Sequence, residues 1–218
     1  RPSFVHRGRV LSKDGIPLEF PQLYLSPSLV TWNNRPGIIF GSDGGYLFYT
    51  EFLGFHEGGG LMLGDPQFIK QINGPLTVDT HAIPCAVDWD GDGDLDLIVG
   101  NEYGCICFFE NVGTRTTPRF VHMEKLKADG KVIRHVPGER PDPQGPLESY
   151  FCGYVNPLVV DWDGDGLLDI IVCDSLGDYT FYRNVGTKTA PKLAKGKTFL
   201  SGGKPFRSVW RTRPAAVD

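Results

Sequence analysis

The stretch Asp88-Trp-Asp-Gly-Asp-Gly-Asp-Leu-Asp96 precedes the apolar run Leu97–Gly100, and the pattern recurs as Asp161-Trp-Asp-Gly-Asp-Gly-Leu-Leu-Asp169 before Ile170–Cys173. Each loop gathers at least four carboxylates within nine residues. Two like charges about 4 Å apart repel by about 1 kcal/mol in water and about 4 kcal/mol near a protein surface, so a cation is expected among them. Alternating aspartates and glycines suit Ca²⁺, which takes about 6–8 oxygen ligands, better than Mg²⁺, which keeps its waters.

An EF-hand is the first alternative, because its loop shares the D-x-D-x-D-G start. That loop needs a Glu at its twelfth position, where this chain has Val99 and Val172. Both loops close instead with Asp at the ninth position, and the apolar runs around them predict strand–loop–strand. The EF-hand is therefore rejected. An acidic surface turn without metal is the simpler alternative, and it is disfavoured because the loop occurs twice in the same context.

The composition predicts an all-β protein. The 218 residues suffice for one large domain, and 28 Gly with 17 Pro suit many short strands joined by tight turns. The net charge is −4 without a basic stripe, so no nucleic-acid partner is expected. No apolar run approaches the length of about 18 residues that a transmembrane helix needs. No signal peptide is present, and the true N-terminus is expected upstream of Arg1. The five scattered cysteines do not suggest a disulfide framework, and Cys105 and Cys107 are predicted to be buried.

Internal repeats organise the chain. Asp88–Pro118 aligns without a gap with Asp161–Pro191 at an offset of 73, and 18 of the 31 positions are identical. A Pro-x-x-Val-(Asp/Thr) pattern begins at positions 27, 84, 157 and 214. A Pro-x-(Phe/Leu) pattern begins at positions 2, 66, 118 and 191. Repetition at this length indicates an array of similar units.

Each unit is predicted to contain four short strands. In the second unit these are Cys85–Asp88, Asp96–Gly100, Cys105–Asn111 and a strand near Phe120. Radially arranged four-stranded units form a β-propeller, so the predicted fold is a partial propeller of about three blades from a ring of roughly seven. The blades are predicted over 27–83, 84–156 and 157–213, with a leading strand in 1–26 and the start of a further blade at 214–218.

The first unit is degenerate. It has Thr31-Trp-Asn-Asn-Arg-Pro36 where the others have the acidic loop, but it keeps the apolar runs Ile38–Gly41 and Tyr46–Tyr49. No calcium is predicted there. Three blades alone would leave strand edges and core surfaces open, which is the reason for expecting a larger ring.

The motif Val-Asp-Trp-Asp-Gly-Asp-Gly-x-x-Asp, followed by two apolar residues and Val, resembles the FG-GAP or VCBS-type propeller repeat. The resemblance covers nearly the whole chain, strongly in the second and third units and weakly in the first. It implies that each acidic loop holds a structural Ca²⁺ between two strands. The implied ligands of the first loop are the side chains of Asp88, Asp90, Asp92 and Asp96 and the carbonyl of Asp94. Those of the second are the side chains of Asp161, Asp163, Asp165 and Asp169 and the carbonyl of Leu167.

Chemistry is expected on the opposite face, at the ends of the strands remote from the acidic loops. Three residues before each repeat proline stand Tyr24, His81, Tyr154 and Arg211, and equivalent positions should converge on the propeller axis. Together with Tyr24, the residues Tyr150, Trp210 and Arg213 are candidate substrate contacts. The simpler alternative is that His81 and Tyr154 only close turns and hydrogen-bond the backbone.

A His, a Tyr and an Arg around one pocket are the groups that uronic-acid polysaccharide lyases use, and several calcium-bearing propeller lyases are similar. The resemblance implies proton transfer or carboxylate neutralisation by His81, base or acid work by Tyr154, and uronate binding by Arg211. The expected partner is an acidic polysaccharide or another glycan, and the expected setting is extracellular or cell-surface. A monomer is expected. The alternatives are a lectin or adhesion propeller that binds without cleaving, and a structural propeller in a larger surface protein.

Overall fold

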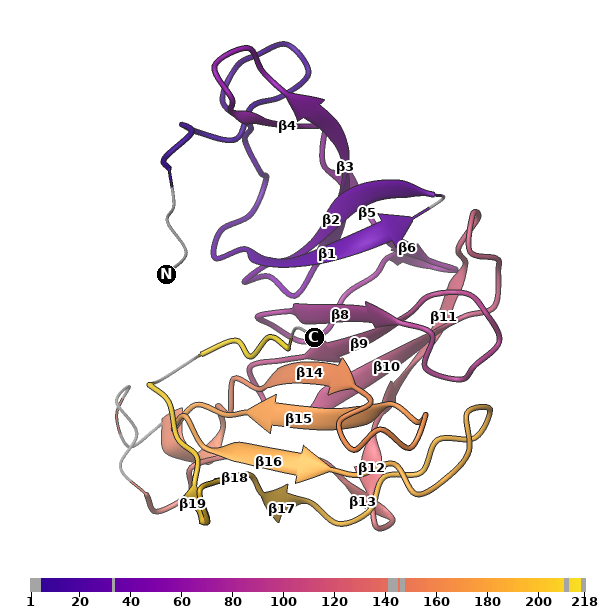
Figure 1. The fold of residues 1–218 in the computed structure, drawn as a ribbon, viewed down its shortest axis with the longest axis vertical. Helices are drawn as coiled ribbons and strands as arrows, with labels where there is room; N and C mark the ends of the chain where they lie inside the picture. The colour runs from indigo at the N-terminus through magenta and orange to yellow at the C-terminus, as the bar shows by residue number, and fades with distance from the viewer. Residues whose placement is uncertain (1–4, 33, 141–144, 146–147, 210–211, 217–218) are drawn as a thin grey trace.

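The computed structural model describes residues 5–32, 34–140, 145, 148–209 and 212–216. Within these ranges the protein is all-β, as the composition predicts, and the only helical element is the 3₁₀ turn η1 (Glu148–Tyr150). The strands form three main antiparallel sheets that follow one another along the chain (Figure 1). The described residues do not form a closed ring. No helix in the described ranges has the length and hydropathy that membrane crossing requires.

Each main sheet is built from consecutive strands. The first contains β1 (Ser26–Trp32), β2 (Arg35–Gly41), β3 (Leu47–Phe55), β4 (Leu61–Leu63) and β5 (Gln67–Phe68). The second contains β8 (Ile83–Val87), β9 (Asp96–Gly100), β10 (Ile106–Asn111) and β11 (Phe120–Lys125), extended by β6 (Lys70–Gln71) and β7 (Gly74–Pro75). The third contains β14 (Asn156–Val160), β15 (Asp169–Cys173), β16 (Tyr179–Tyr182) and β17 (Lys197–Thr198).

The strands lie close to the predicted repeat register. The first strand of each sheet begins one residue before positions 27, 84 and 157. The leading strand expected over 1–26 is different: Pro2 lies outside the described residues, and residues 5–25 contain only isolated bridges at Leu11 and Pro17. Residues 212–216, at the expected start of a further unit, contain no strand.

A short hairpin follows each of β5, β11 and β17, a feature absent from the sequence interpretation. The second is β12 (Lys127–Ala128) with β13 (Lys131–Val132), and the third is β18 (Leu200–Ser201) with β19 (Lys204–Pro205). The first is β6 with β7. The first two hairpins begin the connections that return the chain to β8 and β14.

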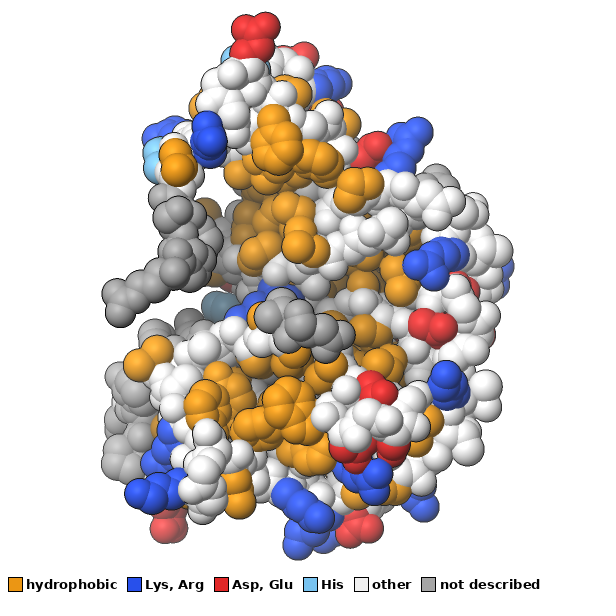
Figure 2. Space-filling view, in the orientation of Figure 1, with side chains coloured by type: hydrophobic (Ala, Val, Ile, Leu, Met, Phe, Trp, Pro, Cys, Tyr) orange, Lys and Arg blue, Asp and Glu red, His pale blue; other side chains and the backbone are white. Residues whose placement is uncertain are grey.

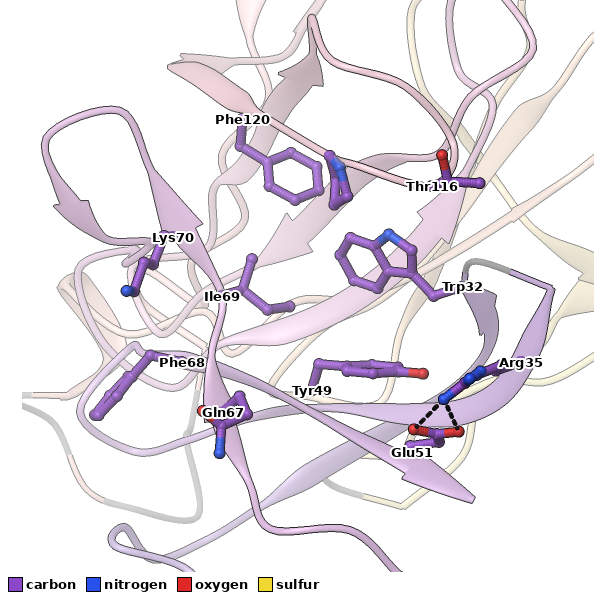
Figure 3. Close-up of a pocket in the computed structure, with 11 residues that line it drawn as sticks. Trp32, Arg35, Tyr49, Glu51, Gln67, Phe68, Ile69, Lys70, Thr116 and Phe120 are labelled. Carbon is purple, nitrogen blue, oxygen red and sulfur yellow. Dashed lines mark hydrogen bonds and ion pairs between the residues drawn. The ribbon is translucent and has the colours of Figure 1, made fainter. Parts of the chain in front are cut away.

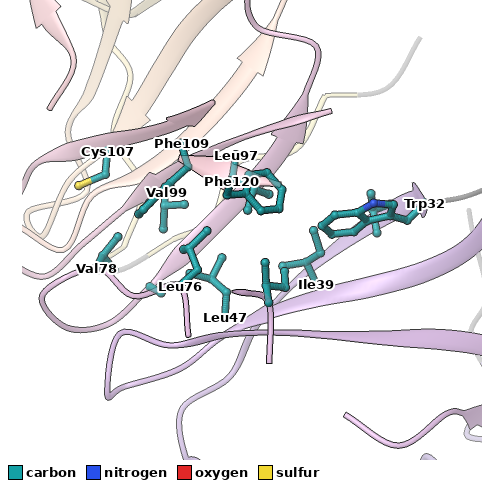
Figure 4. Close-up of a cluster of buried hydrophobic side chains, with 13 residues drawn as sticks. Trp32, Ile39, Leu47, Leu76, Val78, Leu97, Val99, Cys107, Phe109 and Phe120 are labelled. Carbon is teal, nitrogen blue, oxygen red and sulfur yellow. The ribbon is translucent and has the colours of Figure 1, made fainter. Parts of the chain in front are cut away.

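The sheets stack face to face because their strands alternate apolar side chains between two faces. The residues Ile39, Ile98 and Ile171 occupy equivalent positions in the three sheets. Each points to the face of its sheet that looks away from the preceding sheet. Ile39 belongs to the cluster between the first and second sheets, which also contains Val99 and Phe109, and Figure 4 draws it close to Trp32. Ile98 belongs to the cluster between the second and third sheets. The burial of these two clusters joins the three sheets into one body.

The corresponding face of the third sheet carries Ile171, Cys173 and Tyr179, with Leu158 and Phe181 packed against them. Hydrophobic side chains gather over this sheet in the space-filling view (Figure 2). The five cysteines, all in the described part of the chain, form no disulfide, and Cys105 and Cys107 are buried as predicted.

Glycine ends the second strand of the first two sheets because the next sheet comes very close there. A Cβ at Gly41 would overlap the carbonyl oxygen of Ala82, and a Cβ at Gly100 would overlap that of Val155. The first strand of the following sheet therefore lies against a position that has no room for a side chain. The equivalent position in the third sheet is Cys173.

Replacing Gly100 by Ala should loosen the contact between the second and third sheets. Overpacking of this kind costs about 1–3 kcal/mol, and a domain of this size loses about 2–4 °C of melting temperature per kcal/mol. Thermal unfolding followed by circular dichroism measures the loss. The control is Gly58→Ala, where a Cβ would meet only the His56 ring at 3.9 Å. Equal melting temperatures for the two variants would contradict this account of the sheet contact.

Candidate functional site

The two acidic loops join the first and second strands of the second and third sheets. In the first loop, Asp88, Asp90 and Asp92 each offer a carboxylate oxygen, and these oxygens lie within 4.8 Å of one another. In the second loop, Asp161, Asp163 and Asp169 do the same. Two aspartate triads that can hold a metal ion such as Ca²⁺ are therefore present. Asp96 and Asp165, also expected as ligands, lie outside these triads.

Glycine and a buried aspartate give each loop its shape. Gly91 and Gly93 have φ of 73° and 97°, in the left-handed region, where a side chain would be strained. Asp96 is buried, and its carboxylate accepts hydrogen bonds from the backbone N–H of Trp89 at 3.0 Å and of Asn111 at 2.8 Å. This carboxylate thus ties the acidic loop to the turn after β10.

The third sheet repeats this arrangement. Asp169 accepts from the N–H of Trp162 at 3.2 Å and from that of Asn184 at 2.7 Å. The Asn184 side chain in turn accepts from the N–H groups of Gly186 and Lys192, both at 3.0 Å. The repeated Asn-Val-Gly-Thr sequence is therefore a turn organised by an asparagine side chain, and the ninth aspartate of the loop holds it in place.

The first loop has the chemistry of a cation site. Asp88 Oδ1 and Asp94 Oδ1 are buried carboxylate oxygens without a hydrogen-bond partner among the described residues. From the sequence, Asp94 is expected to contribute only its backbone carbonyl. The residue is 7% exposed, so its side-chain carboxylate is also buried in the loop. An unpaired buried carboxylate is strongly unfavourable unless a cation or a proton neutralises it. The orphaned oxygens therefore fit a bound Ca²⁺.

The raised pKa values of Asp94 and Asp96 also indicate that their ionised forms are destabilised in the absence of a cation. Burial, and then the charges of Asp92 and Asp90, raise the pKa of Asp94 to about 6. Burial also raises the pKa of Asp96 to about 7, against the hydrogen bonds from the amides of Asn111 and Trp89. These carboxyl groups are poised to take up protons when no cation is bound.

The opposite end of β8 carries His81, and the opposite end of β14 carries Tyr154. Both residues have left-handed backbone, with φ of 46° and 43°, and the equivalent Tyr24 has φ of 48°. Positive φ is rare for such bulky residues. The ring centroids of Tyr24 and His81 lie 6.1 Å apart, and those of His81 and Tyr154 lie 5.3 Å apart. The structure thus brings three of the four equivalent positions together.

Backbone hydrogen bonds explain why these residues adopt that conformation. The N–H of His81 donates to the carbonyl of Asp43 at 2.9 Å, and the N–H of Tyr154 donates to the carbonyl of Glu102 at 3.1 Å. Each residue therefore closes the turn into its sheet by bonding to the preceding sheet. The side chains are left to point along the same face.

Glu102 is the centre of this group, and the sequence interpretation missed it. Its Oε1 accepts from the Tyr154 hydroxyl at 2.8 Å and from the Cys152 thiol at 3.3 Å. Its Oε2 accepts from the Thr80 hydroxyl at 2.6 Å and lies 3.2 Å from His81 Nδ1. The repeat register could have pointed to Glu102. It stands two residues after the end of the second strand, where the other units have the polar residues Asp43 and Ser175.

Glu102 is held in its ionised form. Burial alone would raise its pKa, but the hydrogen bonds from Thr80, Tyr154 and Cys152, with the nearby His81, outweigh burial and lower the pKa. With an ionised acceptor, we assign the proton of His81 to Nδ1, which leaves Nε2 as an acceptor. Within the described part of the chain, His81 Nε2 has no hydrogen-bond partner. The histidine is 26% exposed and oriented by a carboxylate.

His135, in the next unit, is a useful contrast. Its Nδ1 lies 3.6 Å from Asp174 Oδ2, and its Nε2 lies 2.8 Å from the hydroxyl of Tyr182. Only 11% of the His135 side chain is exposed, and burial raises the pKa of Tyr182 to about 12. Both ring nitrogens of His135 are engaged, so this cluster is a structural one.

The other expected site residues are less closely grouped. Arg211 and Trp210 lie outside the described residues. Tyr150 is 55% exposed in η1. The guanidinium of Arg213 donates to the backbone carbonyls of Pro27 and Pro84, and burial lowers its pKa. Arg213 thus ties the C-terminal segment to the first strands of two sheets, with its donors directed at the backbone.

A separate groove of about 400 Å³ lies between the first and second sheets. Trp32, Tyr49 and Phe68 line it, and the ion pair of Arg35 with Glu51, at 2.9 Å, stands at its edge (Figure 3). Here the short β1–β2 connection takes the place of an acidic loop. An equivalent groove next to Trp89 and Leu193 lies between the second and third sheets. These grooves follow from the stacking of the sheets.

No family model matches the chain, and no similar curated protein or solved structure was found.

Calcium should stabilise the protein more at about pH 8 than at about pH 5. The raised pKa values of Asp94 and Asp96 mean that the folded metal-free protein binds more protons than the unfolded chain between about pH 4 and pH 7, so the stability that these groups contribute falls as the pH rises. Calcium removes this penalty, because it binds the ionised carboxylates of the native state. Melting temperatures with calcium and with EDTA, at both pH values, measure the difference.

The control is the double variant Asp88→Asn/Asp161→Asn, in which calcium should have no effect at either pH. A calcium-induced shift that is larger at acidic pH would contradict the assignment of these carboxylates to the site.

Proposed function

We propose that the chain is part of a calcium-stabilised β-propeller of the FG-GAP or VCBS type, with its three main sheets as blades of a ring of about seven. The stacking of the sheets supports this. Ile39 and Ile98 point to faces that a following sheet covers, and Ile171 points to the equivalent face of the third sheet. The first strands β1, β8 and β14 are neighbours, as the innermost strands of successive blades are.

We further propose that the protein is a polysaccharide lyase that cleaves a uronic-acid-containing polysaccharide by β-elimination. One observation carries this: Glu102 Oε2 lies 3.2 Å from His81 Nδ1, and with the proton assigned to Nδ1 the Nε2 atom is left as a base. A histidine oriented by a carboxylate is a common general base. The choice of a uronate polymer rests on the resemblance to calcium-bearing propeller lyases.

The reaction balances with the groups of the protein and substrate alone. His81 Nε2 takes the C5 proton, the electron pair of that C–H bond forms the C4=C5 double bond, and the C4–O bond breaks. The leaving oxygen receives a proton and becomes the new hydroxyl end of the released sugar. Neutralising the uronate carboxylate lowers the barrier, because negative charge develops next to it. Arg211 is the proposed partner of that carboxylate.

The two tyrosines have different roles in this proposal. Tyr154 is 5% exposed and its hydroxyl donates to Glu102, so it acts as a positioning residue for the Glu102–His81 pair. Tyr24 is 75% exposed and lies beside His81, so its hydroxyl is the better placed to protonate the leaving oxygen. Calcium contributes stability only, because its loops lie at the far ends of β8 and β14.

A lectin-like protein is the second candidate. Tyr24 and Tyr150 are exposed aromatic side chains, at 75% and 55%. Aromatic rings with one polar end can stack on a sugar and hydrogen-bond its hydroxyl groups without any chemistry. Either function places the protein outside the cell or at its surface, where acidic polysaccharides are found.

Replacing His81 by Gln should reduce turnover of the full-length protein by about 10²–10⁴, the usual contribution of a general base. The assay follows the near-ultraviolet absorbance of the unsaturated product on a panel of uronate-containing polymers. Glu102→Gln should also lower turnover and move the acidic limb of the pH profile to lower pH, because the histidine then loses the anionic partner that favours its protonated form. Tyr154→Phe should move that limb less and in the opposite direction, because Glu102 keeps its charge and loses a competing hydrogen-bond donor.

The matched control is His56→Ala, which removes an exposed histidine from the β3–β4 turn and should leave turnover unchanged. Retention of full activity in His81→Gln would refute the assignment of the base. Binding of the polymer without any unsaturated product would refute the lyase and leave the lectin as the function.

A further inference from the structure

The two acidic loops differ in ways that their shared motif conceals. At the seventh position the first loop has Asp94 and the second has Leu167. At the offset of 73 that relates the loops, Glu110 on β10 corresponds to Arg183 after β16. The first loop therefore has five aspartates, and its register counterpart of Arg183 is a sixth carboxylate, whereas the second loop has four aspartates and a guanidinium.

In the second loop this guanidinium takes the place of a cation. Arg183 Nε lies 2.5 Å from Asp163 Oδ2, and its Nη2 lies 2.9 Å from Asp165 Oδ2. One arginine thus bridges two of the four carboxylates that the motif offers to calcium.

The remaining carboxylates of the second loop are also satisfied from within the protein. Asp161 accepts from the backbone N–H groups of Gly164 at 2.9 Å, Asp165 at 3.1 Å and Gly166 at 2.9 Å. Asp169 accepts from two further backbone N–H groups. No buried carboxylate oxygen of this loop, all of which is described, lacks a partner.

The first loop is left unsatisfied. Asp88 Oδ1 and Asp94 Oδ1 are buried and have no hydrogen-bond partner among the residues that the structure describes, although Asp88 Oδ2 accepts from the N–H of Gly93 at 3.2 Å. The corresponding Glu110 is exposed and carries the same sign of charge, so it cannot neutralise the aspartates. This loop needs a cation that the protein does not supply.

We infer that the two loops are unequal metal sites: the first binds Ca²⁺ tightly, and the second binds it weakly because the ion must displace Arg183. The inference rests on the calcium binding in the proposed function and is independent of the lyase chemistry. Calcium affinity in oxygen-ligand sites follows the number of charged ligands. Calcium must separate Asp163 and Asp165 from a guanidinium that already neutralises them, and a positive charge that stays nearby repels the ion.

Calorimetric titration of the calcium-free full-length protein with CaCl₂ should show one tight and one weak binding event. Arg183→Gln should tighten the weak event roughly tenfold, the effect expected on removing one nearby unit charge. Glu110→Arg should weaken the tight event to a similar extent. Arg35→Gln is the charge-matched control, since it removes an arginine paired with Glu51 in the first sheet, and it should change neither event.

Terbium luminescence assigns each event to its loop, because Trp89 and Trp162 lie inside the first and second loops and sensitise a bound lanthanide. Trp162 is 49% exposed, so Trp162→Phe should remove the luminescence of the weak event with little effect on folding.

Two equal affinities, unchanged by Arg183→Gln, would overturn the inference while leaving calcium binding intact. Absence of binding at both loops would overturn the calcium part of the proposed function as well. Unequal binding without polymer cleavage would refute only the lyase.

Discussion

The structure depends on a buried carboxylate that holds two turns together. Asp96 and Asp169, the ninth residues of the acidic loops, each accept one backbone N–H from their own loop and one from the turn after the third strand. Each is almost inaccessible to solvent. Because a buried carboxylate is costly unless it is fully hydrogen-bonded, the surrounding backbone is fixed in one arrangement. The carboxylates of the two aspartate triads and the ends of β9 and β15 take their positions from it.

The strands β8 and β14 connect the acidic loops to the cluster around Glu102. β8 begins next to His81 and ends at Asp88, and β14 begins next to Tyr154 and ends at Asp161. A cation held at one end would stabilise the strands whose other ends carry the Glu102 cluster. The proposed calcium sites and the proposed base His81 thus lie at opposite ends of these strands. The proposed difference in calcium affinity between the loops therefore leaves the proposed proton-transfer group unchanged.

Sheet stacking accounts for the glycines and for the unusual backbone. Gly41 and Gly100 lie where the following sheet presses on the second strand. His81 and Tyr154 donate their backbone N–H groups to the carbonyls of Asp43 and Glu102, just beyond those strands, and both have left-handed backbone, as does the equivalent Tyr24. Such strain persists only where the surroundings enforce it, and it marks candidate functional positions. Here the strain and the ionised Glu102 occur at the same place.

The sequence by itself determined the repeat, and through it the strands. The alternation of apolar residues and the offset of 73 place β9 at Asp96–Gly100, and local turn chemistry explains the Asn-Val-Gly-Thr sequence. Only the tertiary structure decided which charges meet. Glu102 reaches His81 and Tyr154 from 21 and 52 residues away, and Arg183 reaches Asp163 from 20 residues away. These contacts depend on the distance between sheets and between strands, which the local pattern of residues does not contain.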